Sequence, residues 1–201
     1  MLLIDSNGFK PITVLNEGKS NKGPLRFRTI LTTADKKNGN GRVYERKLVE
    51  REMKRLLPLA QERRLTGELD HPDSETVSLK NVSHVITDMH MEGDYLIGEA
   101  EVLATPAGQV LKSLLESGVR IGISSRGTGG LEYCMKREAH VVQDNLKMVT
   151  WDIVADPSCQ DAFPALMEGK VSNTDDAVKS LVEKQRKEQV FLEALRRGLK
   201  K

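Results

Sequence analysis

Cysteine and aromatic residues are scarce in this 201-residue sequence, which holds two Cys and only 4% Phe, Trp and Tyr. Two cysteines, Cys134 and Cys159, are too few for a disulfide framework in a chain of this length. No stretch approaches the roughly 20 apolar residues of a membrane-spanning helix, and the first residues do not resemble a signal peptide. We therefore expect a soluble protein of a reducing cytoplasm, with no membrane partner.

An excess of one charge is also lacking, because 31 Lys and Arg stand against 29 Asp and Glu, a net charge of +2. A dedicated DNA-binding protein usually shows a strong basic excess on one face, so we expect no direct nucleic-acid partner. Metal-ligand spacings such as His-x-x-x-His and Cys-x-x-Cys are absent. A metal hydrolase using His71, Asp70, His84 or His90 is a rival, but the last two would lie about 20 Å apart on one strand. We predict no metal and no cofactor.

The chain divides into three parts by composition. Turn-forming residues without an apolar period predict a weakly structured leader at 1–24. Residues 175–199 are largely charged residues with Leu, Val and Ala, which predicts an amphipathic helix inside a charged tail at 166–201. The domain between the leader and the tail would span residues 25–165.

Alternating and β-branched stretches predict strands in this domain, and helical spacing with start and stop signals predicts two helices. The predicted strands are 25–34, 82–90, 95–103, 119–125, 131–135, 139–142 and 146–154. Residues 44–57 predict a helix that Pro58 would end, and 106–117 predict another with Thr105 as its N-cap. Residues 126–130 (Arg-Gly-Thr-Gly-Gly) predict a loop. These elements make an α+β domain that contains hairpins and allows a partly closed barrel.

Three short segments suggest chemistry rather than packing, and residues 67–72 (Gly-Glu-Leu-Asp-His-Pro) are the first. Pro72 disfavours a helical backbone at His71, and histidine is the usual general base because imidazole titrates near neutral pH. The alternative is a loop histidine that hydrogen-bonds to Asp70 or to the backbone.

The second segment, residues 122–127 (Gly-Ile-Ser-Ser-Arg-Gly), is an apolar strand that runs into two hydroxyls, an arginine and a glycine. A nucleophilic serine needs a rigid element and nearby N–H groups for an oxyanion, although an ordinary strand end has the same composition. The third is Asp152, in the middle of an apolar strand, where burial is costly without a partner. A histidine partner would remove that cost and orient the ring, whereas the alternative is an aspartate that faces solvent.

In this order and spacing, the three segments resemble the prohead core proteases of T-even-type phages. That family carries Gly-Glu-Leu-Asn-His-Pro, Gly-Val-Ser-Ser-Arg-Gly and an aspartate in a later apolar strand. The resemblance covers most of 25–165, includes the Asn-Gly-Arg-Val-Tyr run at 40–44, and departs at Asp70, where the family has Asn. It implies a herpesvirus-protease-like fold, with a mixed or antiparallel β-barrel-like core and flanking helices.

The same resemblance implies a serine endopeptidase with Ser124 as nucleophile, His71 as base and Asp152 as the orienting acid. Its substrates would be phage scaffold or core proteins and the major capsid protein, inside the assembling prohead in the host cytoplasm. Ser124 and Ser125 face opposite sides of a strand, so only one can meet His71, and alignment with the family's first serine favours Ser124. A homo-oligomer is compatible with the sequence.

Neighbours of the nucleophile are candidates for binding the oxyanion or the substrate, namely Ser125, Arg126 and Gly127. Backbone amides near Arg126 and Gly127 would stabilise the oxyanion. The family tends to cleave after glutamate, so the Arg126 side chain is also a candidate for holding a substrate carboxylate, with a surface ion pair as the alternative.

Self-processing sites follow from the family's preference for Leu or Ile, any residue, then Glu. Residues 15–17 (Leu-Asn-Glu) and 166–168 (Leu-Met-Glu) fit this pattern at the two edges of the domain. We predict a zymogen that trims itself after Glu17 and Glu168, because extended flanks are cleaved most easily. A non-catalytic scaffold or capsid-interaction protein is the alternative, suggested by the charged C-terminal helix.

Overall fold

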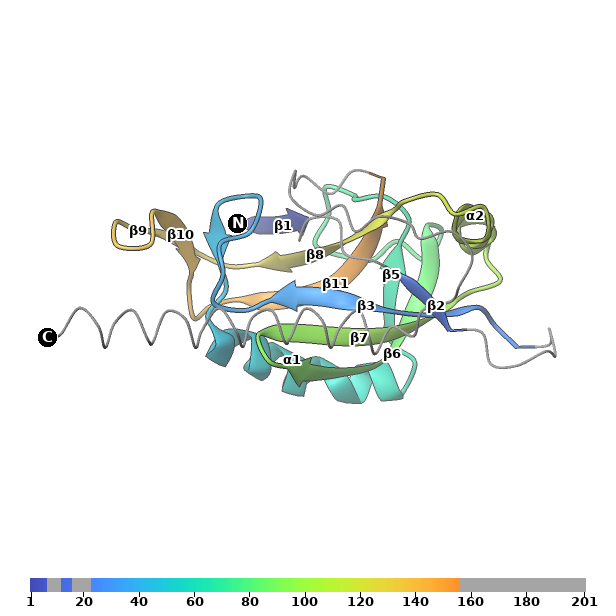
Figure 1. The fold of residues 1–201 in the computed structure, drawn as a ribbon, viewed down its shortest axis with the longest axis horizontal. Coiled ribbons are helices and arrows are strands. Elements are labelled where there is room, and N and C mark those ends of the chain that lie inside the picture. Colours follow the sequence, from blue (N-terminus) through green and yellow to red (C-terminus); the bar gives the residue numbers. More distant parts are fainter. Residues whose placement is uncertain (7–11, 16–22, 156–201) are drawn as a thin grey trace, which may run out of the picture. The chain divides into compact units, whose positions relative to one another are not determined.

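The computed structural model describes residues 1–6, 12–15 and 23–155, all of which belong to one compact unit (Figure 1). The helix predicted at 175–199 and both predicted cleavage residues, Glu17 and Glu168, lie outside these ranges. This unit is of the mixed α+β class. It is mostly antiparallel sheet, with two helices among the described residues.

The largest sheet has five antiparallel strands in the order β2-β3-β7-β6-β5. Their bounds are β2 Thr13–Leu15, β3 Arg26–Thr33, β5 Leu65–Glu68, β6 Val82–Glu92 and β7 Tyr95–Val102. The predicted hairpin is confirmed, since β6 and β7 are adjacent and Gly93 between them has φ 55°, a conformation that favours glycine. This sheet carries the greater part of the apolar alternation seen in the sequence.

A second sheet has the order β1-β8-β11, with β1 Leu2–Ser6, β8 Gly122–Thr128 and β11 Lys147–Val154. All three strands are antiparallel, and Figure 1 shows β8 between the other two. Residues 2–6 therefore differ from the leader predicted at 1–24. Leu3 is buried in the hydrophobic core and β1 pairs with β8 along its whole length, so these residues are part of the folded unit.

The third sheet is small, in the order β4-β10-β9, with β4 Arg42–Val43, β9 Leu131–Cys134 and β10 Ala139–Val142. Each described sheet is open, and an isolated parallel bridge between Leu69 and Ile153 links the end of β5 to β11. The described strands therefore form no closed barrel, and the barrel-like part of the prediction is not confirmed. The bridge matters for function because it holds the segment after β5 against β11.

Two helices flank these sheets, α1 Arg46–Gln61 and α2 Pro106–Glu116. The Thr105 side chain accepts a hydrogen bond from the Gly108 N–H at 3.0 Å, so the predicted N-cap of α2 is confirmed. Pro58 does not end α1 as predicted but lies inside its last turn, where Ala60 is still buried against the core. Neither described helix is long and apolar enough to cross a membrane.

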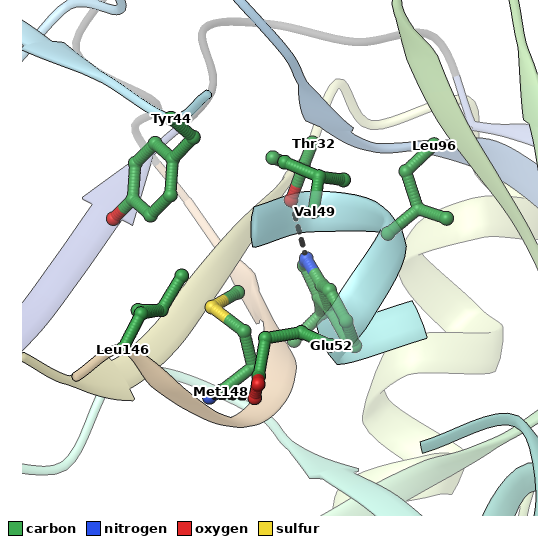
Figure 2. A pocket seen from close by; sticks show the side chains of 8 residues that line it. Thr32, Tyr44, Val49, Glu52, Leu96, Leu146 and Met148 are labelled. Atoms are coloured by element: carbon green, nitrogen blue, oxygen red, sulfur yellow. Dashed lines mark hydrogen bonds between the residues drawn. The ribbon is translucent and has the colours of Figure 1, made fainter. Parts of the chain in front are cut away.

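Polar side chains join the five-stranded sheet to β11 inside the core. The Thr150 hydroxyl donates to the Thr66 carbonyl at 2.7 Å, and the Trp151 indole N–H donates to Thr32 Oγ1 at 3.1 Å. A small cavity with about 10 Å³ of free volume lies nearby, where Figure 2 shows Glu52 against Met148. Such a volume is too small for a substrate, so this cavity is not a substrate-binding site.

Candidate active site

A serine, a histidine and an aspartate from three segments meet where β5 ends beside β8 and β11. The Nε2 of His71 lies within hydrogen-bonding distance of Ser124 Oγ, and its Nδ1 lies 3.0 Å from Asp152 Oδ2. Asp152 stands directly opposite Ser124 in the β8–β11 ladder, so their side chains share one face of the sheet. The fold therefore brings together the three residues that the sequence singled out, in the order hydroxyl, imidazole, carboxylate.

The protonation pattern of this chain of contacts follows from its donors and acceptors. An ionised carboxylate only accepts hydrogen bonds, so the Nδ1 of His71 carries the proton that it donates to Asp152. The Nε2 of a neutral ring then accepts from the Ser124 hydroxyl. Asp152 is fully buried whereas the His71 side chain is 18% exposed, so the ring is the member of the pair that solvent reaches.

Ser125 points away from the histidine. Its hydroxyl donates to the backbone oxygen of Asp5 in β1 at 3.4 Å, on the opposite face of β8 from Ser124. This arrangement separates the two serines as the alternation of a strand requires, and only Ser124 contacts His71. Ser125 binds a structural strand, so the role in oxyanion or substrate binding that the sequence suggested does not fit its position.

The Arg126 side chain is buried and holds carboxylates of the protein itself. Its NH2 lies 2.9 Å from Glu68 Oε1 and 3.1 Å from Asp152 Oδ1, and its Nε lies 2.9 Å from Asp152 Oδ2. Its NH1 donates to the carbonyls of Ser74 and Thr76 at 2.9 and 3.1 Å. The guanidinium is fully buried and has these acceptors around it, so its observed partners are groups of the protein itself, and the predicted role in holding a substrate glutamate stays a prediction.

The backbone amides of Arg126 and Gly127, which we predicted to bind the oxyanion, lie inside the β1-β8-β11 sheet. Both residues belong to β8 instead of the loop predicted at 126–130, and both are paired with β1 on one side and β11 on the other. Backbone N–H groups of a central strand point toward its neighbours in the sheet. A side chain on Gly127 would come within 2.9 Å of the Lys147 carbonyl oxygen, so this glycine permits close strand packing rather than a turn.

Glu68 is a site residue that the sequence reasoning missed. Its Oε1 accepts from the Ser78 N–H and from Arg126, both at 2.9 Å, and its own N–H donates to Asp152 Oδ1 at 3.0 Å. Its Oε2 has no hydrogen-bond partner within the described part of the chain. The sequence signal that could have identified Glu68 is its position inside the 67–72 segment, three residues before His71.

The remainder of the 67–72 segment shapes the backbone around His71. A side chain at Gly67 would come within 2.2 Å of the Trp151 carbonyl oxygen, so only glycine allows β5 to approach β11 this closely. Asp70 has φ 66° and donates its N–H to the Ile153 oxygen at 2.8 Å. Asp and Asn are the side-chain-bearing residues that most readily adopt this conformation. The exchange of the family's Asn for Asp70 is thus compatible with the turn.

A second histidine, His84, is buried behind the site and takes no part in it. Its Nε2 lies 3.1 Å from the Trp151 oxygen and its Nδ1 lies 2.9 Å from the Ser83 hydroxyl. Burial lowers the pKa of His84 to about 4, although the charge of Asp152 and the hydrogen bond to Trp151 oppose this shift. Neutral His84 therefore joins β6 to β11 at neutral pH.

The described ranges hold no group of three or more His, Cys, Asp and Glu side chains arranged to bind a metal ion. His84 and His90, which the metal-hydrolase rival required, contact different partners. His84 faces Trp151, whereas His90 lies 2.8 Å from Glu92 at the far end of β6.

Comparison with known proteins agrees with this geometry. The family model for the prohead core protein serine protease matches residues 10–174. The prohead core protein protease of Enterobacteria phage T4 is 30% identical over 180 aligned residues, and the match covers 83% of this chain and 83% of the phage T4 protein. The solved structure of the bacteriophage T4 capsid assembly protease matches with a TM-score of 0.69 and 25% identity, over 76% of this chain and 96% of that one. This chain therefore belongs to the family of prohead core protein serine proteases.

Proposed function

We propose that the chain is a serine endopeptidase in which Ser124 is the nucleophile, His71 the general base and Asp152 the acid that orients it. One observation carries this proposal: the two ring nitrogens of His71 face Ser124 Oγ and Asp152 Oδ2 at the same time. A histidine that held only a structural role would not need both partners in this order.

The reaction would proceed by two proton transfers through His71. Ser124 Oγ attacks the carbonyl carbon of the scissile peptide bond while His71 Nε2 takes its proton. The tetrahedral intermediate collapses as His71 returns the proton to the leaving amine, which leaves an acyl group on Ser124. Water then attacks this ester by the same route, and the free carboxyl product departs.

The buried charges around Asp152 favour the histidine cation that forms between these steps. Glu68 and Asp152 bring two carboxylates to the single guanidinium of Arg126, which leaves an excess of one negative charge beside the ring. Because this cluster is withdrawn from water, its field acts on the imidazolium with little screening. Arg126 and Glu68 would thus be positioning residues that hold Asp152 rather than groups that touch substrate.

Prohead scaffold or core proteins and the major capsid protein are the substrates we propose, inside the assembling prohead in the host cytoplasm. The names of the two phage T4 relatives, a prohead core protein protease and a capsid assembly protease, support this choice. We propose cleavage after Glu in Leu- or Ile-x-Glu sequences, including self-cleavage after Glu17 and Glu168. The similar Leu-Leu-Glu at 114–116 lies in α2 and would be protected by the helix.

Intact-mass spectrometry of the wild-type chain beside Ser124→Ala tests this proposal, together with labelling by a fluorophosphonate. Wild type should carry one label on Ser124 and lose both ends with time, while the variant should take no label and stay full length. A scaffold without catalytic activity would show neither label nor trimming. Equal masses and no label in both proteins after long incubation would reject the protease.

A further inference from the structure

The nucleophile strand is held from two sides, and the second side is the N-terminal strand. On one side, β11 places Asp152 opposite Ser124; on the other, β1 places Ser6 opposite Ser124 and Asp5 opposite Ser125. The predicted cleavage after Glu17 lies after β1 and β2 in sequence and before β3 and the rest of the unit. That cut would separate β1 covalently from the strand that it supports.

Asp5 anchors β1 in a carboxylate cradle built by the segment 40–44. Its Oδ1 accepts from Asn40 Nδ2 at 2.9 Å and from Arg42 NH1 at 2.7 Å, and its Oδ2 accepts from the Tyr44 hydroxyl. The carboxylate is fully buried, although Arg42 is partly exposed. A buried carboxylate with three donors, one of them charged, is a strong and directional attachment.

The backbone of β1 is attached at several further points. The same Asn40 and Arg42 side chains donate to the Ile4 oxygen at 3.1 and 3.0 Å, and the Gly129 N–H donates to the Met1 oxygen at 3.1 Å. Leu3 is 1% exposed and belongs to the hydrophobic core. A second strand before the cut, β2, pairs with β3 through Thr13, Val14 and Leu15.

We propose that the fragment cut off after Glu17 stays bound to the protease without a covalent link, through β1 and held chiefly by Asp5 in the 40–44 cradle. This inference rests on the proposed self-cleavage and goes beyond it, because trimming would then sever the N-terminal segment without releasing it. The mature enzyme would be a complex of two chains. The Asn-Gly-Arg-Val-Tyr run would serve as a binding site for the N-terminal strand.

The test uses the full chain in a Ser124→Ala background, which prevents self-cleavage. A recognition sequence for a specific exogenous protease is inserted between Glu17 and Gly18, and the purified, folded chain is cut there. Size-exclusion chromatography and native mass spectrometry then measure whether the N-terminal fragment stays bound. Asp5→Asn is the test variant, because an amide presents an N–H2 group to donors, and Asp88→Asn on the exposed part of β6 is the matched control.

The fragment should remain bound in the parent and in Asp88→Asn, and its retention in Asp5→Asn should be at least about tenfold weaker. Release from the parent as readily as from Asp5→Asn would overturn the proposal. Since no catalysis is needed in this background, the outcome is independent of the mass experiment that decides whether self-cleavage occurs.

A second arm covers the case in which Asp5→Asn does not fold. A labelled synthetic peptide of residues 1–17 is exchanged into the cut parent complex, and unlabelled wild-type and Asp5→Asn peptides compete with it. The Asp5→Asn peptide should require at least about ten times the concentration for equal displacement. Equal competition by the two peptides would contradict the anchor.

Discussion

Two buried aspartates flank β8, one in each neighbouring strand, and they differ in what surrounds them. Asp152 in β11 and Asp5 in β1 are both fully buried, and each lies opposite one of the two serines of β8. Asp5 is bound by an amide, a guanidinium and a phenol from one short segment. Asp152 is bound by the Arg126 guanidinium of β8 and by a backbone N–H and an imidazole of the 67–72 segment.

Asp5 and Asp152 are equally buried, so the different roles of these two carboxylates depend on their hydrogen-bonding partners. The donors of Asp5 are an amide, a guanidinium and a phenol of the 40–44 segment, and they attach β1 to that segment. One donor of Asp152 is the imidazole of His71, whose other ring nitrogen reaches Ser124. The same residue type in the same sheet is therefore an anchor on one edge and the proposed catalytic partner of His71 on the other.

Replacing each aspartate by asparagine is the most direct test of the difference between Asp152 and Asp5. Asp152→Asn should lower kcat/KM by about 10⁴-fold, because the amide favours the wrong tautomer of His71. Asp5→Asn should change the rate per active site by less than about tenfold but lower the free energy of unfolding by about 1–3 kcal/mol. Peptide cleavage normalised by fluorophosphonate titration, beside urea unfolding, gives both values. Equal losses of rate per titrated site in the two variants would show that the two positions are not distinct.

Removing the Arg126 guanidinium, the cation that binds both Asp152 and Glu68, should have the next largest effect. Arg126→Met leaves both carboxylates buried without their cation and should destabilise the fold by about 3–5 kcal/mol. The double variant with Glu68→Gln should recover part of that loss, since one uncompensated charge is then gone. Urea unfolding of the single and double variants measures the coupling. Stability equal to wild type in Arg126→Met would contradict the buried ion-pair network.

Acid should weaken the connection between β6 and β11 that His84 makes through its contact with the Trp151 oxygen. Because its pKa in the folded state lies near 4, below the ordinary value of 6.5, its contribution is complete above about pH 6.5 and is lost as pH falls toward 4. Wild type should lose roughly 2 kcal/mol more than His84→Gln between pH 7 and pH 5. Unfolding curves at both pH values provide the check, with His140→Gln on β10 as a control that should follow wild type.

Ser125→Ala should have the smallest effect of these changes. Its single long hydrogen bond to the Asp5 oxygen contributes about 1 kcal/mol or less, and the proposed nucleophile is its neighbour. Cleavage should stay within a few-fold of wild type while Ser124→Ala is inactive. An inactive Ser125→Ala beside an active Ser124→Ala would reverse the assignment of the nucleophile.

Local patterns in the sequence predicted the elements whose signals are local. The hairpin of β6 and β7, the Thr105 cap of α2 and the strand around Asp152 needed only alternation, a capping residue and an apolar run. The helix end at Pro58 was placed too early, because burial of Ala60 outweighs a local preference. The α+β class was thus predictable, and the openness of the sheets was not.

The sequence by itself determined which residue types are available for catalysis and in what order they occur along the chain. The tertiary structure was needed to show that Arg126 faces inward to Glu68 and Asp152 and that residues 2–6 complete the sheet that holds Ser124. Both features depend on residues that are distant along the chain, such as Asp5, which lies opposite Ser125 in the sheet. Burial of a charge or a strand edge is stable only when such distant partners supply the missing hydrogen bonds.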